Sequence, residues 1–266
     1  MARSSSTGPR SAGGHFARRR FGQHFLVDRH YIERIVAALD PRLNDSIVEI
    51  GPGLGALTGP LLERVKRLTV IEIDRDLAAR LAAEHPVERL TLYTADALEF
   101  DFASLGADLR VVGNLPYNIS SPLLFHLAQY EATLFDVTVM LQREVVERMS
   151  AAPATAAYGR LSVMLQVRFR IERLFTVPPG AFRPVPQVES AVVRLIPLRD
   201  ARPRIADEAL FARIVIAAFG QRRKTLRNAL KTFAGESDLE RVGIAPGARG
   251  ETLSVANFVR LANALA

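Results

Sequence analysis

The chain has 266 residues, of which 48% are hydrophobic, a formal net charge of +7 and no cysteine. This length and composition fit one large folded domain, or an α/β domain with a small second domain. The lack of cysteine excludes disulfides, thiolate metal sites, iron-sulfur clusters and a cysteine nucleophile.

The positive charge favours a polyanionic partner, either nucleic acid or a membrane surface, and it is concentrated in two segments. Residues 1–20 contain five arginines and no acid, and residues 211–231 are also basic without an acid. Because residues 1–20 hold few apolar side chains, we expect a disordered basic arm. The sequence has no signal-peptide run and no stretch of about 18 to 20 apolar residues, which predicts a cytoplasmic protein without a membrane partner.

The first two thirds of the chain alternate between helical and strand patterns. Apolar residues at helical spacing predict a helix over 31–39, and further helices are expected over 61–65 and up to about residue 83. Short β-branched runs predict strands over 47–50, 68–73, 90–93, 109–112 and 137–141. This alternation predicts a parallel sheet with helices on both faces and a ligand site at the carboxyl ends of the strands.

In the last third of the chain the alternation of strand and helix patterns gives way to helical patterns. Residues 161–171 fit a strand, or equally a helix followed by a strand, whereas 190–196 read as a strand. Beyond residue 200 the pattern is helical, with an apolar stripe over 210–219 and Ser254 as the N-cap of a last helix. We therefore expect an α/β domain over 21–199 and a small helical domain over 200–266.

A glycine-rich loop, Gly51-Pro52-Gly53-Leu54-Gly55, follows the strand that ends at Ile50 and precedes a helix. Glycines let the chain turn sharply and let a ligand approach the backbone. A dinucleotide enzyme uses a related loop, and a tight turn without any ligand is the alternative interpretation.

Two carboxylates follow the next two strands, Glu72 at the tip of one and Asp96 after the other. Glu72 could accept the two ribose hydroxyls of a nucleoside, and Asp96 could accept an adenine amine. Each could instead be a helix cap or a turn former. With the glycine loop they indicate an adenosine-containing ligand, for which NAD and S-adenosylmethionine both qualify.

The tetrapeptide Asn114-Leu115-Pro116-Tyr117 lies where the fourth strand ends. Methylation of an exocyclic amine needs acceptors that draw the N–H groups into place, and the Asn114 amide and the Leu115 carbonyl can supply them. Tyr117 offers a stacking face for an extruded base. An ordinary Asn-x-Pro turn is the alternative, and the motif would equally suit a DNA or protein-glutamine methyltransferase.

Several motifs in one order resemble the ribosomal RNA adenine N6,N6-dimethyltransferase family, and the bacterial small-subunit (16S) branch is the better match. They are Phe21 to Leu26, Val48 to Gly53, Val70 to Asp74, Asn114 to Ser120, Phe182 to Ser190, and Gln221 to Asn228. The resemblance implies a Rossmann-like class I methyltransferase fold, with a mostly parallel seven-stranded sheet and a small C-terminal all-helical domain. It also implies dimethylation of two adjacent adenosines near the 3′ end of the small-subunit rRNA.

The resemblance also implies S-adenosylmethionine as cofactor, S-adenosylhomocysteine as product, no metal, the small ribosomal subunit and its rRNA as partners, and a monomer. It places the cofactor against His24, Leu26, Gly51, Glu72, Asp96 and Asn114. It places the target adenine against Asn114, Leu115, Tyr117 and Phe182, although a packed core phenylalanine is the simpler interpretation of the last. The residues expected at RNA are Arg222, Arg223, Lys224 and Arg227, in a run expected to begin a helix.

One of these positions departs from the family. Its bacterial members commonly carry asparagine where this chain has His24, which can still donate a hydrogen bond. Three other functions stay open on the sequence: methylation of large-subunit rRNA, an assembly factor whose binding outweighs its chemistry, and an NAD-dependent oxidoreductase that shares the glycine loop.

Overall fold

The computed structural model describes residues 11–12, 15–16, 24–221 and 223–266. Most of the expected arm over 1–20 lies outside these residues, and within it β1 (Ser11–Ala12) pairs antiparallel with β2 (His15–Phe16). The chain separates into two compact units. The first unit comprises residues 1–143 and 173–194, and the second comprises 144–172 and 195–266.

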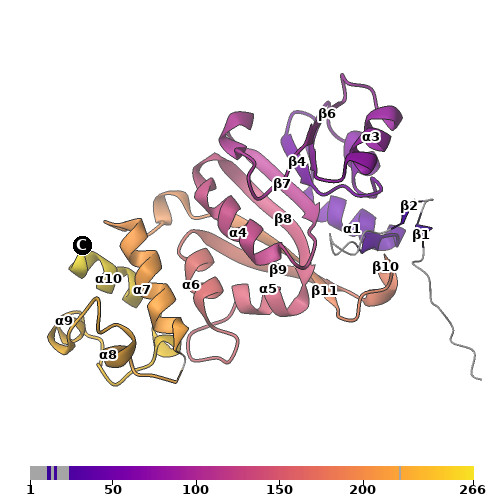
Figure 1. The fold of residues 1–266 in the computed structure, drawn as a ribbon. Coiled ribbons are helices and arrows are strands. Elements are labelled where there is room, and N and C mark those ends of the chain that lie inside the picture. Colours follow the sequence, from indigo (N-terminus) through magenta and orange to yellow (C-terminus); the bar gives the residue numbers. More distant parts are fainter. Residues whose placement is uncertain (1–10, 13–14, 17–23, 222) are drawn as a thin grey trace, which may run out of the picture. The chain divides into compact units, whose positions relative to one another are not determined.

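Seven strands form one sheet in the order β6-β5-β4-β7-β8-β11-β9 (Figure 1). Their bounds are β4 (Ser46–Ile50), β5 (Leu68–Glu72), β6 (Leu90–Thr94), β7 (Leu109–Asn114), β8 (Leu134–Gln142), β9 (Phe169–Val177) and β11 (Ser190–Pro197). The pairs from β6 through to β8 are all parallel. The strands predicted from β-branched runs are confirmed, and so is the mostly parallel sheet.

The strand order reverses beside β4. From β4 the chain passes to β5 and β6 on one side, then returns to β7 and β8 on the other. Such a reversal opens a crevice at the carboxyl ends of the strands, because the two connecting loops leave in opposite directions. The glycine loop after β4 and Asn114 at the end of β7 therefore meet at the natural ligand position of this sheet.

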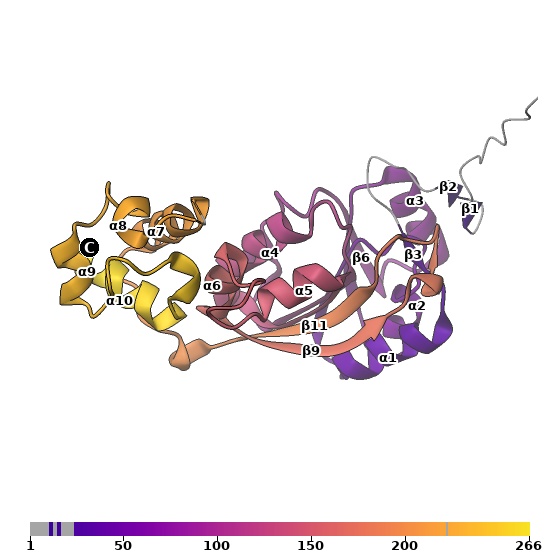
Figure 2. The ribbon, with the colours of Figure 1, turned by 90° about the horizontal axis from the view of Figure 1, so that it is seen from below.

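Helices of the first unit cover the sheet, and Figure 2 shows α1 and α4 on opposite faces. Their bounds are α1 (Arg29–Leu39), α2 (Thr58–Leu62), α3 (Arg75–Glu84) and α4 (Ser120–Gln129). Asp28 caps α1 by accepting from the backbone N–H of His30. Ile35, Val36 and Leu39 of α1 are buried in the core with residues of β4, β5 and β7.

The helix α4 is absent from the sequence-based expectation. Its buried apolar residues, Leu123, Leu124, Leu127 and Ala128, recur at helical spacing, and Ser120 is buried with them. Pro122 lies in the first turn. Proline is tolerated there because the first turn has no intrahelical acceptor for the missing N–H group.

A two-residue pairing joins segments far apart in the chain. The strand β3 (Phe25–Leu26) pairs antiparallel with β10 (Phe182–Arg183), so that Leu26 lies opposite Phe182. Two residues are too few to show a strand periodicity, and only the folded chain reveals this contact. Short 3-10 turns in the described residues lie at Phe102–Leu105, Glu131–Thr133, Pro179–Ala181, Arg199–Ala201 and Gly250–Thr252.

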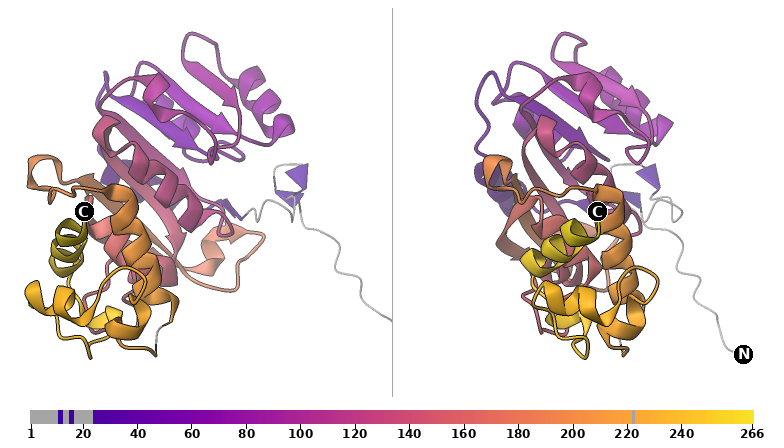
Figure 3. Two further views of the ribbon diagram at one scale, coloured as in Figure 1. Left: turned by 60° about the vertical axis from the view of Figure 1, so that its left-hand side comes forward. Right: turned by 90° about the vertical axis from the view of Figure 1, so that its left-hand side faces the viewer.

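The second unit is helical, and its helices α7 to α10, coloured orange to yellow, gather around one another (Figure 3). Its helices are α5 (Arg143–Met149), which enters the unit at residue 144, α6 (Arg160–Gln166), α7 (Glu208–Gly220), α8 (Leu226–Ala229), α9 (Glu236–Arg241) and α10 (Val255–Leu265). Ser254 caps α10 as predicted, accepting from the Asn257 N–H.

The division between the units differs from the expected boundary near residue 200. Tyr158, Val163 and Val167 are buried in one cluster with Phe211 and Phe258, which draws residues 144–172 into the helical unit. The ambiguous stretch 161–171 contains all of α6 except its first residue, followed by the start of β9, so the interpretation as a helix and then a strand is confirmed. The sequence pattern could not reveal the boundary between the two units, because the buried cluster brings together side chains from distant segments.

The basic run also differs from its expectation. The helix α7 ends at Gly220 and α8 begins only at Leu226, so Arg223 and Lys224 lie in the turn between them, and Arg222 is outside the described residues. The N–H groups of Leu226 and Arg227 donate to the carbonyls of Ala248 and Pro246. These hydrogen bonds to distant residues pair two backbone N–H groups that the expected helix would have paired internally.

Candidate functional site

The glycine loop after β4 has the backbone that its composition predicts. Gly51, Gly53 and Gly55 have φ values of +64°, +58° and +81°, which are costly for residues with a Cβ atom. The Gly51 N–H donates to the Ile71 carbonyl at 2.9 Å, continuing the contact between β4 and β5. A Cβ at Gly113 of β7 would lie 2.5 Å from the Ile50 carbonyl oxygen, so only glycine lets β7 approach the loop this closely.

Glu72, at the end of β5, is buried, with 4% of its surface exposed. Its carboxylate accepts from the Asp74 N–H at 2.8 Å and from the Gly53 N–H at 3.3 Å, which ties β5 to the glycine loop. Burial raises the pKa of Glu72, while these two donors act in the opposite direction. The carboxylate is thus held in one orientation at the cavity wall.

A second buried carboxyl group, Glu49 of β4, lies beside the loop with 1% of its surface exposed. The Thr58 hydroxyl donates to it at 2.7 Å. Burial raises the pKa of Glu49 to about 8, with the neighbouring Glu72 adding to the increase. A pKa of about 8 keeps Glu49 mostly protonated at neutral pH, so this carboxyl group adds little negative charge to the wall of the cavity.

Asp96 lies after β6 and is partly exposed. One of its oxygens accepts from the Leu98 N–H at 2.9 Å, as in an Asx turn. The interpretation of Asp96 as a turn former is therefore confirmed. Asp96 also lines the cavity, and a carboxylate has further acceptor positions for a ligand N–H.

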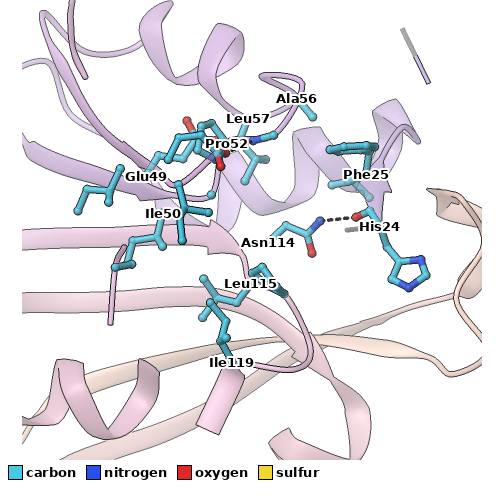
Figure 4. A pocket seen from close by; sticks show the side chains of 18 of the residues that line it. His24, Phe25, Glu49, Ile50, Pro52, Ala56, Leu57, Asn114, Leu115 and Ile119 are labelled. Atoms are coloured by element: carbon cyan, nitrogen blue, oxygen red, sulfur yellow. Dashed lines mark hydrogen bonds between the residues drawn. The ribbon is translucent and has the colours of Figure 1, made fainter. Parts of the chain in front are cut away.

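Asn114 ends β7 and reaches across to the segment before α1 (Figure 4). Its Nδ2 group donates to the His24 carbonyl at 2.9 Å. This bond orients the amide with Oδ1 directed away from His24, as Figure 4 shows. The orientation agrees with the acceptor role expected for the Asn114 oxygen.

Leu115 and Tyr117 follow in the turn that leaves β7. The Leu115 side chain is 1% exposed, and its N–H donates to the Met140 carbonyl at 3.1 Å. Tyr117 is half-buried, and its hydroxyl lies 2.7 Å from the Ser190 hydroxyl. The His24 ring stacks on the Tyr117 ring with a centroid separation of 5.4 Å.

One cavity at the carboxyl ends of β4, β5, β6 and β7 brings most of the expected site together. The expected residues that line it are His24, Leu26, Gly51, Glu72, Asp96, Asn114, Leu115 and Tyr117. Phe182 is not among the lining residues. Its ring is fully buried in the core opposite Leu26, which is the simpler of the two interpretations that the sequence left for it.

Several lining residues lie outside the sequence-based list. Glu49 precedes the glycine loop, Ile73 follows Glu72 with 45% of its surface exposed, and Ala97 follows Asp96. An apolar residue directly after an acidic strand tip is a usable signal, because a nucleoside needs an apolar wall beside its polar contacts. Ser190, by contrast, has no local signal, since only its contact with Tyr117 connects it to the site.

The expected RNA-contacting residues that are described, Arg223, Lys224 and Arg227, are exposed. Arg227 lies 3.4 Å from Glu236. No group of three His, Asp or Glu side chains in the described part of the chain is arranged to hold a metal ion. Among the same residues, no helix is long and apolar enough to span a bilayer.

Two solved structures share this architecture. A dimethyladenosine transferase from Plasmodium falciparum has a TM-score of 0.77 at 24% identity, covering 90% of this chain and 96% of that one. The 23S rRNA methyltransferase ErmE has a TM-score of 0.67 at 28% identity, covering 91% and 99%. The parallel sheet with its reversal at β4 and its strand-end cavity is the fold of a class I methyltransferase.

The sequence comparisons identify the family to which the chain belongs. The family model for ribosomal RNA adenine dimethylase matches residues 14–266, and the chain belongs to this family. A relative named ribosomal RNA small subunit methyltransferase A, from Aromatoleum aromaticum, is 60% identical over 252 residues, 95% of each chain. A relative of the same name from Thiobacillus denitrificans is 59% identical over 244 residues, 92% of this chain and 96% of its own.

Proposed function

We propose that this enzyme uses S-adenosylmethionine to dimethylate the N6 amines of two adjacent adenosines near the 3′ end of small-subunit (16S) rRNA, with S-adenosylhomocysteine as product. The observation that carries the proposal is that Glu72 and Asp96 line the same cavity as Asn114, Leu115 and Tyr117. Family membership and the names of the relatives support the choice of ribosomal adenine and of the small subunit.

The residues around the cavity fit this cofactor. Glu72 uses its two oxygens to accept from the backbone and keeps acceptor positions for the ribose hydroxyls, while Asp96 would accept the adenine amine. A cationic ligand near Glu49 would favour ionisation of that carboxyl group, and the backbone at Gly51 would pass beside the ligand without a side chain. When bound, S-adenosylmethionine supplies a methyl group on a positively charged sulfur.

The other end of the cavity would hold the acceptor base. Asn114 Oδ1 and the Leu115 carbonyl would accept from the adenine amine and hold the nitrogen towards the methyl donor. Tyr117 would stack on the extruded base, which returns about 1–3 kcal/mol of the few kcal/mol that extrusion costs. The chain thus contributes alignment, and alignment alone supports catalysis by up to roughly 7–11 kcal/mol.

The proposal is tested by incubating the protein with methyl-labelled S-adenosylmethionine and unmethylated ribosomal subunits. We expect label in small subunits, where mass analysis of digested rRNA finds dimethyladenosine, and none in large subunits. Replacing Glu72 by alanine should lower cofactor affinity at least about tenfold, the equivalent of one lost charged hydrogen bond. Glu88→Ala, at an exposed glutamate, is the matched control. Unchanged cofactor affinity in Glu72→Ala would contradict the assignment of the cavity.

A second candidate function is methylation of large-subunit rRNA. The structural likeness to the 23S rRNA methyltransferase ErmE favours it, whereas the relatives with the higher identity are named for the small subunit. Label that enters large subunits would select this alternative. A role in subunit assembly can coexist with methylation, and Glu72→Ala should then still bind small subunits in a sedimentation assay.

A further inference from the structure

The Tyr117 ring is held by a residue that lies outside the cavity. The Tyr117 hydroxyl lies 2.7 Å from the hydroxyl of Ser190, the first residue of β11. In the sheet β11 is separated from β7 by β8, so the contact spans two strand spacings. Ser190 is fully buried, whereas Tyr117 is half-buried. The tip of the tyrosine ring is therefore anchored to the interior of the sheet.

One face of the same ring is already covered. The His24 ring lies on it at a centroid separation of 5.4 Å, with an angle of 26° between the two planes. His24 is itself held twice, through Nδ1 at 2.8 Å from the Pro184 carbonyl and through its own carbonyl, which accepts from Asn114. A base that stacks on Tyr117 while His24 keeps this place can use only the second face.

We infer that Ser190 is a positioning residue for capture of the acceptor base, because its hydroxyl group fixes the plane of the Tyr117 ring beside Asn114 and Leu115. The inference rests on the proposed function, in which Tyr117 stacks on the extruded adenine. Ser190 does not line the cavity, so it would act only through the tyrosine.

The physical argument concerns rotation of the ring. A phenol without its anchor can turn about its side-chain torsions, and a base then loses stacking area or an aligned amine. Burial raises the pKa of Tyr117, so its hydroxyl group stays protonated and able to share a hydrogen bond with Ser190 over the working pH range. Removal of either hydroxyl should have the same consequence, because the two groups form one contact.

The test is a double-mutant cycle with Ser190→Ala, Tyr117→Phe and the double variant, all in the full chain. We expect each single variant to lower kcat/KM for unmethylated subunits by about three- to tenfold, as loss of one buried hydrogen bond predicts. The double variant should be no slower than the slower single variant, because one contact can be lost only once. Calorimetric titration with S-adenosylmethionine should give a Kd within about twofold of wild type in all three, because Ser190 acts on base capture and not on the cofactor.

Ser162→Ala is the control, since it removes another fully buried serine hydroxyl in the second unit. The Ser162 hydroxyl donates to the Arg148 carbonyl and accepts from the Gly159 N–H. The kcat/KM of this variant should stay near wild type once the protein is shown to be folded by thermal unfolding. Multiplicative effects in the double variant, an unchanged rate in Ser190→Ala, or an equal loss in Ser162→Ala would each overturn the inference.

The cycle is measured on whichever ribosomal subunit the wild-type protein labels. Label in large subunits alone would contradict the proposed substrate while the cycle still decides the role of Ser190. Label in small subunits with independent effects of the two hydroxyls would leave the proposed function standing and reject the inference. Absence of transfer to either subunit would reject both.

Discussion

At the scale of single residues, burial decides the charge of the Glu49 carboxyl group. It lies in the cavity wall with 1% of its surface exposed, and its pKa is raised to about 8. Burial in this position disfavours the charged form of the carboxyl group. The Thr58 hydroxyl, which donates to Glu49 at 2.7 Å, offsets part of the cost of burying the carboxyl group.

The raised pKa of Glu49 predicts a pH-dependent stability. The group has a reference pKa of 4.5 and a folded pKa of about 8, so its stabilising contribution is complete below 4.5 and is lost as the pH rises through 8. Glu49→Gln cannot ionise and escapes this loss. Relative to wild type, the variant should gain more than about 1 kcal/mol in unfolding free energy between about pH 5 and about pH 8.5.

Urea unfolding of both proteins at the two pH values measures this gain. Glu88→Gln, at an exposed glutamate, should show no comparable change between the two pH values. An equal difference between Glu49→Gln and wild type at both pH values would mean that Glu49 is ionised in the folded protein at neutral pH.

At the scale of elements, a buried ion pair fixes the strands at the end opposite the cavity. Arg110, near the start of β7, donates to Asp136 of β8 at 3.0 and 2.8 Å and to Asp45 before β4 at 2.7 Å. The same guanidinium donates to the carbonyls of Leu39 and Asp40 at the end of α1. It therefore satisfies the helix carbonyls that have no partner within α1.

Removing Asp136 should destabilise the fold without altering the cavity. Asp136→Ala leaves Arg110 buried with one carboxylate fewer, which we expect to cost about 3–5 kcal/mol. Asp45→Ala is the matched control, because Asp45 is more exposed, with 20% against 4% of the side-chain surface, and its loss should cost less. Thermal unfolding and cofactor titration measure the two effects. A Kd that weakened in proportion to the lost stability would show that the amino ends of the strands also shape the site.

At the scale of the whole molecule, the net charge of +7 should appear as salt-dependent binding to rRNA. Arg223 and Lys224 are exposed in the turn after α7, and Arg222 precedes them in the sequence. If both described cations contact phosphates, Arg223→Ala with Lys224→Ala should reduce the slope of log affinity against log salt by about 1.5 to 2.

The control removes the same charge elsewhere. Arg29→Ala with Arg80→Ala eliminates two arginines that form helical ion pairs with Glu33 and Glu84. Filter binding of unmethylated subunits over a range of salt concentrations should give an unchanged slope for this control. Equal slopes for both double variants would mean that the turn after α7 contributes only to the general field of the protein.

The main strands and the ligand position followed from local patterns. Runs such as Ile47 to Ile50, the glycines after them and the acids at successive strand ends are each contained in a few residues, and parallel strands bring their carboxyl ends to one edge. The cavity contains eight residues named from the sequence, of which His24 and Leu26 were named by the family resemblance alone. The β3–β10 pairing and the bounds of the helical unit were missed, since each depends on a partner distant in the chain. The helix α4 was also missed, although its buried leucines recur at helical spacing in the local sequence.

The sequence by itself therefore determined the class of fold, the edge of the sheet that carries the site and the chemistry of the groups placed there. Only the tertiary structure decided that Phe182 packs in the core, that His24 covers one face of Tyr117 and that Ser190 holds the tip of the ring. The physical reason is the separation along the chain over which each kind of interaction acts. Periodicity and turn chemistry act over a few residues, whereas a side chain's final contacts depend on which distant segments the buried core brings against it.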